Sequence, residues 1–265
     1  MWAWPSFGRT AISSGHGYQS LIDRFRRARS DDTLAVLEGF HPLKHALRFG
    51  ATILETVTQD LDKLDSLVPS LAPDLVDILA KGGTEVPTTV FRQLSPAPPA
   101  TGVISLALRP AYGPQPFGSP EPLLLLENPR SHGNIGAAVR VAAAAGAAGV
   151  VTTGDHDPWH PPALVGSAGL HFALPVVWLR GLNVDELPAS LDDRELLAVD
   201  PEGEPLDSGS VPDGAILAFG TERDGLSPEL LAAARGRIAI PMEPGISSLN
   251  LATAVAVVLY ARRLG

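Results

Sequence analysis

The fold of the second half of this chain is decided by the stretch Leu123-Leu-Leu-Leu-Glu-Asn128-Pro-Arg130-Ser-His-Gly-Asn134-Ile-Gly-Ala-Ala-Val-Arg140. Its four leucines predict a short buried strand, and the polar residues that follow predict a loop. The small apolar residues after the loop favour a helix over 134–145, for which Asn134 is a good N-cap. A strand that passes through a loop into a helix is typical of parallel α/β sheets, whose ligands lie at the carboxyl ends of the strands.

A second region repeats this arrangement further along the chain. It comprises Phe219-Gly220-Thr-Glu222-Arg-Asp-Gly225-Leu-Ser227, Ile240-Pro-Met242 and Ser247-Ser248-Leu249-Asn250-Leu-Ala252. Gly220 ends an apolar strand, where a missing side chain lets a ligand approach the backbone. Together the two regions suggest a backbone-lined pocket for a nucleoside-like ligand. Further strands are expected at 149–153, 175–179, 196–199, 215–220 and 237–241, and further helices at 161–167 and 228–234.

These motifs, in this order, resemble those of the SpoU (TrmH-type) RNA 2′-O-ribose methyltransferases of the SPOUT class, over residues 122–265. The resemblance implies an α/β-knot domain with a parallel sheet and a deep trefoil knot. It implies S-adenosylmethionine as cofactor and a ribose 2′-hydroxyl of RNA as methyl acceptor. Ribosomal and transfer RNA both remain open, and the two-domain layout favours ribosomal RNA.

The resemblance also assigns roles to individual residues. Main-chain groups at four positions are expected to bind the cofactor: Gly220, Ile240, Met242 and Leu249. Five residues are expected in the catalytic site: Asn134, Arg140, Glu222, Ser248 and Asn250. Asn128 and Arg130 are expected to contact the substrate. Several of these residues also suit structural roles, since asparagine and serine favour turns and helix caps and an acid favours a helix start.

Arg140 is the only charged residue in a helix of small apolar residues. A lone cation in such a helix should be costly unless it is paired or functional. One alternative is an ion pair between subunits. The other, which the resemblance favours, is a role in methyl transfer. Arg140 would then either accept the proton of the 2′-hydroxyl or stabilise the developing charge, and guanidinium rarely gives up its own proton.

Residues 1–110 are expected to form a separate small α/β domain, followed by a linker over 111–121 that is rich in proline and glycine. Helices are expected at 18–28 and 40–48, and strands at 34–37 and 52–57. The pattern Leu37-Glu-Gly39-Phe-His41-Pro-Leu-Lys-His45-Ala-Leu, with Ala100-Thr-Gly102-Val-Ile-Ser-Leu-Ala, resembles the N-terminal RNA-binding domain of many SpoU enzymes, which is similar to ribosomal protein L30e.

The charge of the chain limits how it can hold RNA. The net charge is -9, and residues 111–265 carry the whole acidic excess. Phosphate contacts should therefore be local. Arg26 and Arg27 lie in the densest basic run and are expected to contact RNA, although a solvated helix face is an equal alternative. Pro162 and Val165 occupy positions where the family carries lysine and arginine, which removes two expected phosphate contacts.

The remaining features bear on compartment, assembly and metals. The chain has no cysteine, no membrane-length apolar run and no signal-like N-terminus, so we expect a cytoplasmic protein. The final helix, expected over 248–264, is apolar almost all round, which favours a homodimer through the C-terminal domain. His156 and His160 lie in a proline-rich loop that does not preform a ligand pair, so no metal is expected there.

Two other classes of function compete with methyl transfer. One is a catalytically inactive RNA-binding knot protein, which the presence of Asn134, Arg140, Glu222 and Asn250 argues against. The other is a dinucleotide-dependent oxidoreductase, which the absence of G-x-G-x-x-G after a strand argues against.

Overall fold

The computed structural model describes residues 15–79, 82–112, 117–180, 191, 194–221 and 224–265. The chain divides into two compact units, Met1–Ala111 and Tyr112–Gly265. Each unit has a sheet of its own.

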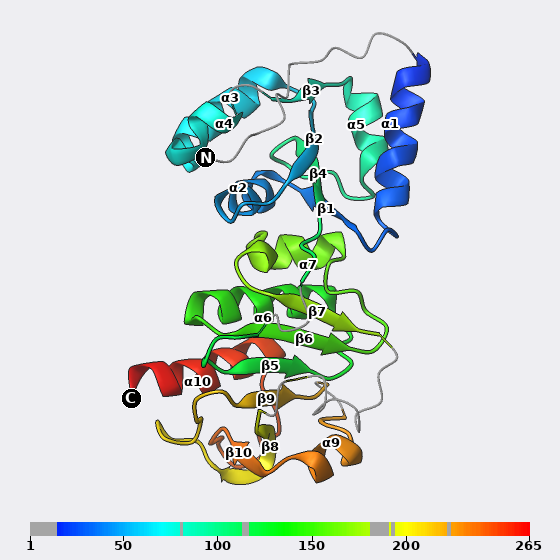
Figure 1. Cartoon of the computed structure of the whole chain (residues 1–265). Coiled ribbons are helices and arrows are strands. Elements are labelled where there is room, and N and C mark those ends of the chain that lie inside the picture. Colours follow the sequence, from blue (N-terminus) through cyan, green and yellow to red (C-terminus); the bar gives the residue numbers. More distant parts are fainter. Residues whose placement is uncertain (1–14, 80–81, 113–116, 181–190, 192–193, 222–223) are drawn as a thin grey trace. The chain divides into compact units, whose positions relative to one another are not determined.

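The first unit is a small α/β unit with a four-stranded sheet in the order β1-β4-β2-β3. Its strands are β1 (Leu34–Glu38), β2 (Ile53–Thr58), β3 (Thr84–Glu85) and β4 (Val103–Leu108). Its helices are α1 (Gly15–Ala28), α2 (Phe40–Arg48), α3 (Leu61–Leu71), α4 (Val76–Leu79) and α5 (Thr88–Leu94), with a 3-10 turn at Pro73–Leu75. Helices α1 and α5 cover one face of the sheet, and α2, α3 and α4 cover the other (Figure 1). The four elements predicted here are confirmed, each within three residues.

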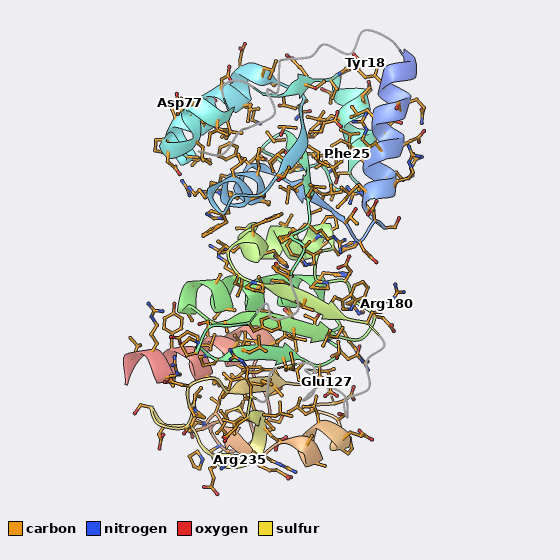
Figure 2. The ribbon with its side chains drawn as sticks, viewed as in Figure 1. Tyr18, Phe25, Asp77, Glu127, Arg180 and Arg235 are labelled. Carbon is orange, nitrogen blue, oxygen red and sulfur yellow. The ribbon has the colours of Figure 1, made fainter. Side chains whose placement is uncertain are left out.

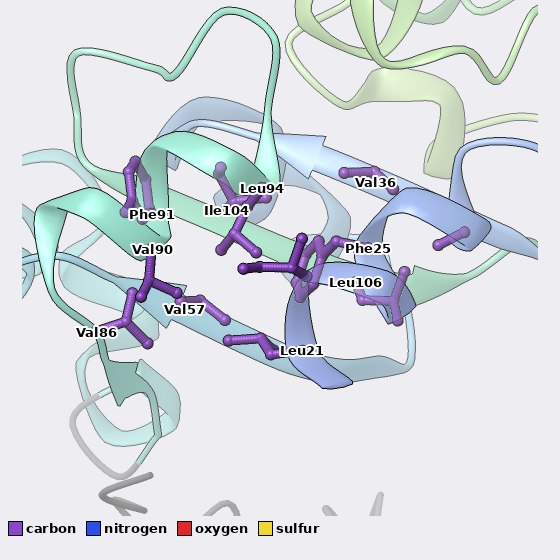
Figure 3. Close-up of a cluster of buried hydrophobic side chains, with 12 residues drawn as sticks. Leu21, Phe25, Val36, Val57, Val86, Val90, Phe91, Leu94, Ile104 and Leu106 are labelled. Atoms are coloured by element: carbon purple, nitrogen blue, oxygen red, sulfur yellow. The ribbon is translucent and has the colours of Figure 1, made fainter. Parts of the chain in front are cut away.

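The core of the first unit forms where α1 and α5 meet the sheet. Phe25 of α1 is fully buried, and Phe91 of α5 lies in the same cluster (Figure 3). Val57 and Ile104 contribute from the strands. Burial of side chains of this size contributes about 1.5–3 kcal/mol each, so this face stabilises the unit. The basic residues of α1 are left on its solvent-exposed face.

The second unit contains a six-stranded sheet in the order β10-β8-β9-β5-β6-β7, in which every pair of neighbours is parallel (Figure 1). Its strands are β5 (Leu123–Leu126), β6 (Gly149–Thr153), β7 (Val176–Leu179), β8 (Leu196–Pro205), β9 (Ile216–Phe219) and β10 (Gly236–Ala239). All four leucines of β5 are completely buried, as expected for a central strand that is covered on both faces. The predicted parallel α/β sheet is confirmed. The trefoil knot stays a prediction.

In the described part of this unit, four helices flank the sheet: α6 (His132–Ala145), α7 (Pro161–Gly166), α9 (Pro228–Ala233) and α10 (Leu251–Leu264). A second 3-10 turn spans Leu170–Phe172. Helix α6 packs against both α7 and α10. The contact with α7 is very close, because a Cβ atom at Gly136 would lie 2.1 Å from the carbonyl oxygen of Ala163. No side chain fits at Gly136 without moving one of the two backbones.

Three of the boundaries that differ from the predictions have a structural cause. Helix α6 begins at His132, because the hydroxyl of Ser131 accepts the backbone N–H of Asn134 at 3.3 Å and caps the helix instead of Asn134. Helix α10 begins at Leu251, because Asn250 and not Ser248 caps it. Strand β8 runs on to Pro205 instead of ending at 199, because its second part pairs with β10 after a bulge.

Candidate active site

The loops after β5 and β9 meet at the carboxyl ends of these strands. Glu127 directly follows β5 (Figure 2), and its carboxylate accepts the backbone N–H of Ser227 at 2.7 Å. Ser227 in turn caps α9 through its hydroxyl, which accepts the N–H of Leu230. The first motif is thereby fixed to the second across 100 positions of sequence.

A cleft of about 420 Å³ opens beside these loops, and its wall mixes backbone with apolar side chains. It is lined by all four residues predicted to bind the cofactor and by one predicted catalytic residue: Gly220, Ile240, Met242, Leu249 and Ser248. Phe219, Leu251 and Ala254 add apolar surface. A cleft of this size, in which apolar walls alternate with polar groups, suits a nucleoside-sized ligand.

Gly220 lines the cleft, but its lack of a side chain has a different cause from the expected one. A Cβ atom there would lie 2.0 Å from the carbonyl carbon of Gly225. Thr221 and Gly225 exchange two backbone hydrogen bonds, at 3.0 and 3.1 Å, that fold this loop back on the strand. The backbone of Gly225 therefore occupies the space that a side chain at Gly220 would need. Glycine is required at this position for the chain to fold, whether or not a ligand binds.

Asn134 and Asn250, which are 116 positions apart in sequence, are joined side chain to side chain. The Nδ2 of Asn250 donates to the Oδ1 of Asn134 at 3.1 Å. The Oδ1 of Asn250 accepts the N–H of Ala252 at 3.0 Å and so caps α10. Asn250 therefore combines a cap with a contact to the first motif. Two of the predicted site residues are brought together in this way.

Arg140 is exposed on α6 and forms no hydrogen bond or ion pair with any residue that the structure describes. We expected a lone cation in this helix to be costly. That expectation was wrong for the single chain, because the guanidinium is solvated and no burial penalty arises. An exposed arginine without a structural partner remains available to a ligand or to a second subunit.

Asn128 and Arg130 lie in the exposed loop between β5 and α6. Asn128 adopts a left-handed backbone, with φ of 44°, and its N–H donates to the hydroxyl of Thr153 at 3.0 Å. A side chain at Gly154 would lie 2.2 Å from Oδ1 of Asn128, so the loop packs against the end of β6. Arg130 forms an exposed ion pair with Asp224 at 3.3 Å.

Three further residues were predicted to belong to the site: Glu222, Arg26 and Arg27. Glu222 lies outside the described residues. Arg26 and Arg27 are exposed on α1 of the first unit, where Arg26 pairs with Asp23 at 2.9 Å and Arg27 donates to the backbone oxygen of Asp23. Arg27 therefore forms no ion pair among the described residues, whereas Asp23 offsets part of the charge of Arg26.

Three histidines gather at the start of α6. His156 and His160 were considered together from the sequence, whereas His132 was missed. The ring of His132 stacks on that of His160, with centroids 4.2 Å apart, and lies 5.0 Å from that of His156. Burial, aided by the two neighbouring imidazoles, lowers the pKa of His132 to about 4. No group of three or more ligating side chains with metal-binding geometry occurs among the described residues. The sequence did carry a signal for this cluster, because His132 follows β5 and His156 and His160 follow the neighbouring strand β6.

Two further observations concern the surroundings of the site. Pro162 and Val165 are exposed on α7, so the positions that lack the family's cations face solvent. Asp200 and Glu202, which follow the expected end of β8, line the cleft and were also missed. They were missed because the sequence pattern predicted that this strand ends at residue 199.

Comparison with known proteins decides the family. Residues 121–260, half of the chain, match the sequence model of the SpoU rRNA Methylase family. This chain belongs to the SpoU family. The family assignment predicted from the three motifs is confirmed.

Individual SpoU relatives cover different shares of the chain. An uncharacterized tRNA/rRNA methyltransferase of Synechocystis is 36% identical over 53% of this chain, and the chain spans only 52% of that relative. The 23S rRNA (adenosine(1067)-2′-O)-methyltransferase of Streptomyces laurentii is 29% identical over 92% of this chain and 91% of its own. The fold matches the SpoU methyltransferase AviRb of Streptomyces viridochromogenes, solved in complex with AdoMet, with a TM-score of 0.75 at 23% identity over 95% of this chain and 98% of that chain.

Proposed function

We propose that this SpoU protein transfers a methyl group from S-adenosylmethionine to a ribose 2′-hydroxyl of ribosomal RNA. The observation that carries the proposal is the cleft at the carboxyl ends of β9 and β10, whose lining residues Leu249 and Leu251 flank Asn250 of the Asn134–Asn250 pair. The Streptomyces laurentii relative, which aligns over nearly the whole chain, is a 23S rRNA 2′-O-methyltransferase and supports ribosomal RNA.

The residues of the cleft fit a nucleoside cofactor. Backbone at Gly220, Ile240 and Leu249 offers donors and acceptors for the edge of an adenine, and Phe219 and Leu251 offer apolar walls for its faces. S-adenosylmethionine supplies a methyl group on a sulfonium, which already carries a good leaving group. The chain therefore has to position the acceptor and manage its proton.

Arg140 is the candidate for the proton step. It can hold a phosphate near the reacting ribose or stabilise the alkoxide as the 2′-hydroxyl loses its proton. A guanidinium rarely acts as a base, so the electrostatic role is the one we favour. Asn134 and Asn250 align the acceptor, and Ser248 at the rim of the cleft joins them. Correct alignment alone can supply several kcal/mol of the barrier.

The substrate side of the proposal uses the exposed loops and the first unit. Asn128 and Arg130 lie on the loop between β5 and α6, and the ion pair of Arg130 with Asp224 is exposed enough to open for a phosphate. We propose that the first unit is an L30e-like RNA-binding domain over residues 1–110, with Arg26 and Arg27 as phosphate contacts. A tRNA acceptor and a catalytically inactive RNA-binding protein are the alternatives.

We further propose a homodimer through the second unit. Helix α10 buries one face against α6, whereas Val257 is exposed at 37% on an otherwise apolar helix. An apolar side chain in this position suits a subunit interface. A second subunit would also reach the unpartnered Arg140. Among the described helices none is long and apolar enough to cross a membrane, and we propose a cytoplasmic location.

The test is methyl transfer with defined RNA classes. The purified protein is incubated with methyl-labelled S-adenosylmethionine and either ribosomal or transfer RNA from a strain that lacks the gene, and the labelled nucleotide is mapped by mass spectrometry. Label in a ribose of ribosomal RNA supports the proposal. Label in tRNA alone supports the alternative substrate. Cofactor binding without transfer to either RNA supports an inactive protein.

A further inference from the structure

The bulge of β8 brings an acidic side chain to the cleft. Strand β8 pairs with β10 up to Ala198, opposite Arg237, and pairs again from Glu204, opposite Ile238. The residues between these two pairs lie outside the β10 ladder, and four of them line the cleft: Val199, Asp200, Pro201 and Glu202. The bulge is therefore a wall of the cleft and not an irregularity far from it.

The backbone fixes this bulge in place. A Cβ atom at Gly203 would lie 2.6 Å from the backbone carbon of Arg237, so only glycine lets β8 return against β10. Pro201 has no N–H to offer to a ladder. On its other side β8 pairs with β9 up to Ala198 opposite Ala218, which places Asp200 at the level where β9 ends beside Gly220.

Asp200 differs from the other acids of the cleft in its burial. Its side chain is only 15% exposed, whereas that of Glu202 is 85% exposed and that of Asp224 is 67% exposed. The Oδ1 of Asp200 accepts the N–H of Glu202 at 2.9 Å, and Arg237 approaches the same oxygen at 3.8 Å. Its Oδ2 accepts no hydrogen bond from any residue that the structure describes. An oxygen of a largely buried carboxylate that accepts no hydrogen bond is costly, so a ligand that donates to it would be bound favourably.

We infer that Asp200 binds the ribose hydroxyls of the cofactor's adenosine, an inference that rests on the function proposed above. A ribose diol offers two O–H donors, and a carboxylate oxygen accepts two. In other parallel sheets that bind nucleosides, an acidic residue after the strand next to the glycine-bearing one binds a ribose hydroxyl. Asp200 has that relation to Gly220 on β9. It is thus a specificity-determining residue for a ribonucleoside cofactor.

The experiment is calorimetric titration of the full chain with S-adenosylhomocysteine and with its 2′-deoxy and 3′-deoxy counterparts. Asp200→Asn keeps an oxygen for the N–H of Glu202, so the bulge is preserved, but it replaces the free acceptor by a donor. We expect this variant to bind S-adenosylhomocysteine about 10- to 100-fold more weakly than the wild type, as for the loss of a charge-assisted hydrogen bond. The deoxy compounds should bind the wild type with a similar deficit and should lose little further in the variant.

A matched control is Glu204→Gln, which removes a charge from the same strand at an exposed position outside the cleft and should change affinity less than about threefold. If Asp200→Asn binds as tightly as the wild type, the assignment of Asp200 is overturned while the proposed function stands. If the variant binds S-adenosylhomocysteine more weakly but still discriminates against the deoxy compounds as the wild type does, Asp200 acts only through its charge and the inference also fails. If the wild type binds none of these nucleosides, the proposed function itself is wrong.

Discussion

The side chain of Asn250 donates a hydrogen bond to the side chain of Asn134 at 3.1 Å and caps helix α10 at the same time. The bond joins the helix after β5 to the last helix of the chain. The amide pair therefore adds a polar link to the packing of α6 against α10, and its contribution can be tested without disturbing the cap.

Asn250→Ser separates the two roles of this residue. Serine caps a helix about as well as asparagine, so the free energy of unfolding should change by less than about 0.5 kcal/mol. Serine is too short to reach Asn134, so methyl transfer should fall about 10- to 100-fold because the acceptor is misaligned. Asn250→Ala should lose the cap as well and unfold about 1 kcal/mol more easily. If the losses in Asn134→Ala and Asn250→Ser simply multiply in the double variant, the two residues act independently.

Arg140→Ala should remove most methyl transfer and leave the affinity for S-adenosylmethionine within about threefold, because Arg140 does not line the cleft. Its exposure predicts a change of less than about 0.5 kcal/mol in the free energy of unfolding. Arg140→Lys should retain part of the activity if only charge matters, and little if planar contact matters. Equal loss of cofactor binding and of activity would make Arg140 a structural residue.

Ala254→Met tests the position of the cofactor cleft. Ala254 lies on α10 and lines the cleft, so a longer side chain there should reduce the affinity for S-adenosylmethionine at least about tenfold by steric exclusion. The control is Thr253→Met, an exposed neighbour outside the cleft, which should bind normally. Calorimetry measures both. Normal binding by Ala254→Met would place the cofactor elsewhere.

Val257→Glu tests the dimer. A carboxylate at an apolar interface is costly to bury, so the full chain should sediment as a monomer at micromolar concentration when the wild type sediments as a dimer. Ala232→Glu, at an exposed position on α9, should leave the assembly unchanged. A monomeric wild type would contradict the proposed homodimer directly.

The stability of the second unit should depend on pH through His132. Its pKa is lowered from 6.5 to about 4, first by burial and then by His160 and His156, while Asp157 opposes the shift. The unfolded chain therefore takes up a proton that the folded chain refuses, and stability present above pH 6.5 is lost as the pH falls toward 4. Because His132 is only partly buried, we expect a loss of about 1 kcal/mol, well below the full value for the shift.

His132→Asn should flatten this pH dependence, as measured by denaturant unfolding at pH 7, 5.5 and 4. His41→Asn, an exposed substitution in the first unit, should not. Equal slopes for wild type and His132→Asn would show that the imidazole titrates normally.

The local pattern predicted the sheet of the second unit well. Strand β5 is four consecutive leucines, and a short apolar run of this kind between turn residues is typical of a buried strand. Caps were predicted less well, because Ser131 and Asn134 compete for one helix start and Ser248 and Asn250 for another. Local sequence favours each of them, and tertiary contacts decide. The amide pair of Asn134 and Asn250 depends on how distant loops meet, which periodicity does not encode.

The cleft shows the same division. Gly220, Ile240 and Leu249 were found because motifs carry them, whereas Asp200 was missed because Pro201 and Gly203 read as the end of a strand. The strand instead resumes after the bulge, since a glycine in that place allows a close return against β10. Gly220 was expected to lack a side chain so that a ligand could approach. In the structure, the backbone of Gly225 already excludes a side chain there.

The close contact of Gly136 with Ala163 has a consequence for how substrate preference can change. With the two backbones touching, α7 has no freedom to slide on α6, and a shift there would have to displace the helix that carries Asn134. Pro162 and Val165 nonetheless point their side chains to solvent from this fixed helix. Substitutions on α7 can therefore change its exposed side chains but not its position. Lysine and arginine could replace Pro162 and Val165 without shifting α6 or the site residue Asn134.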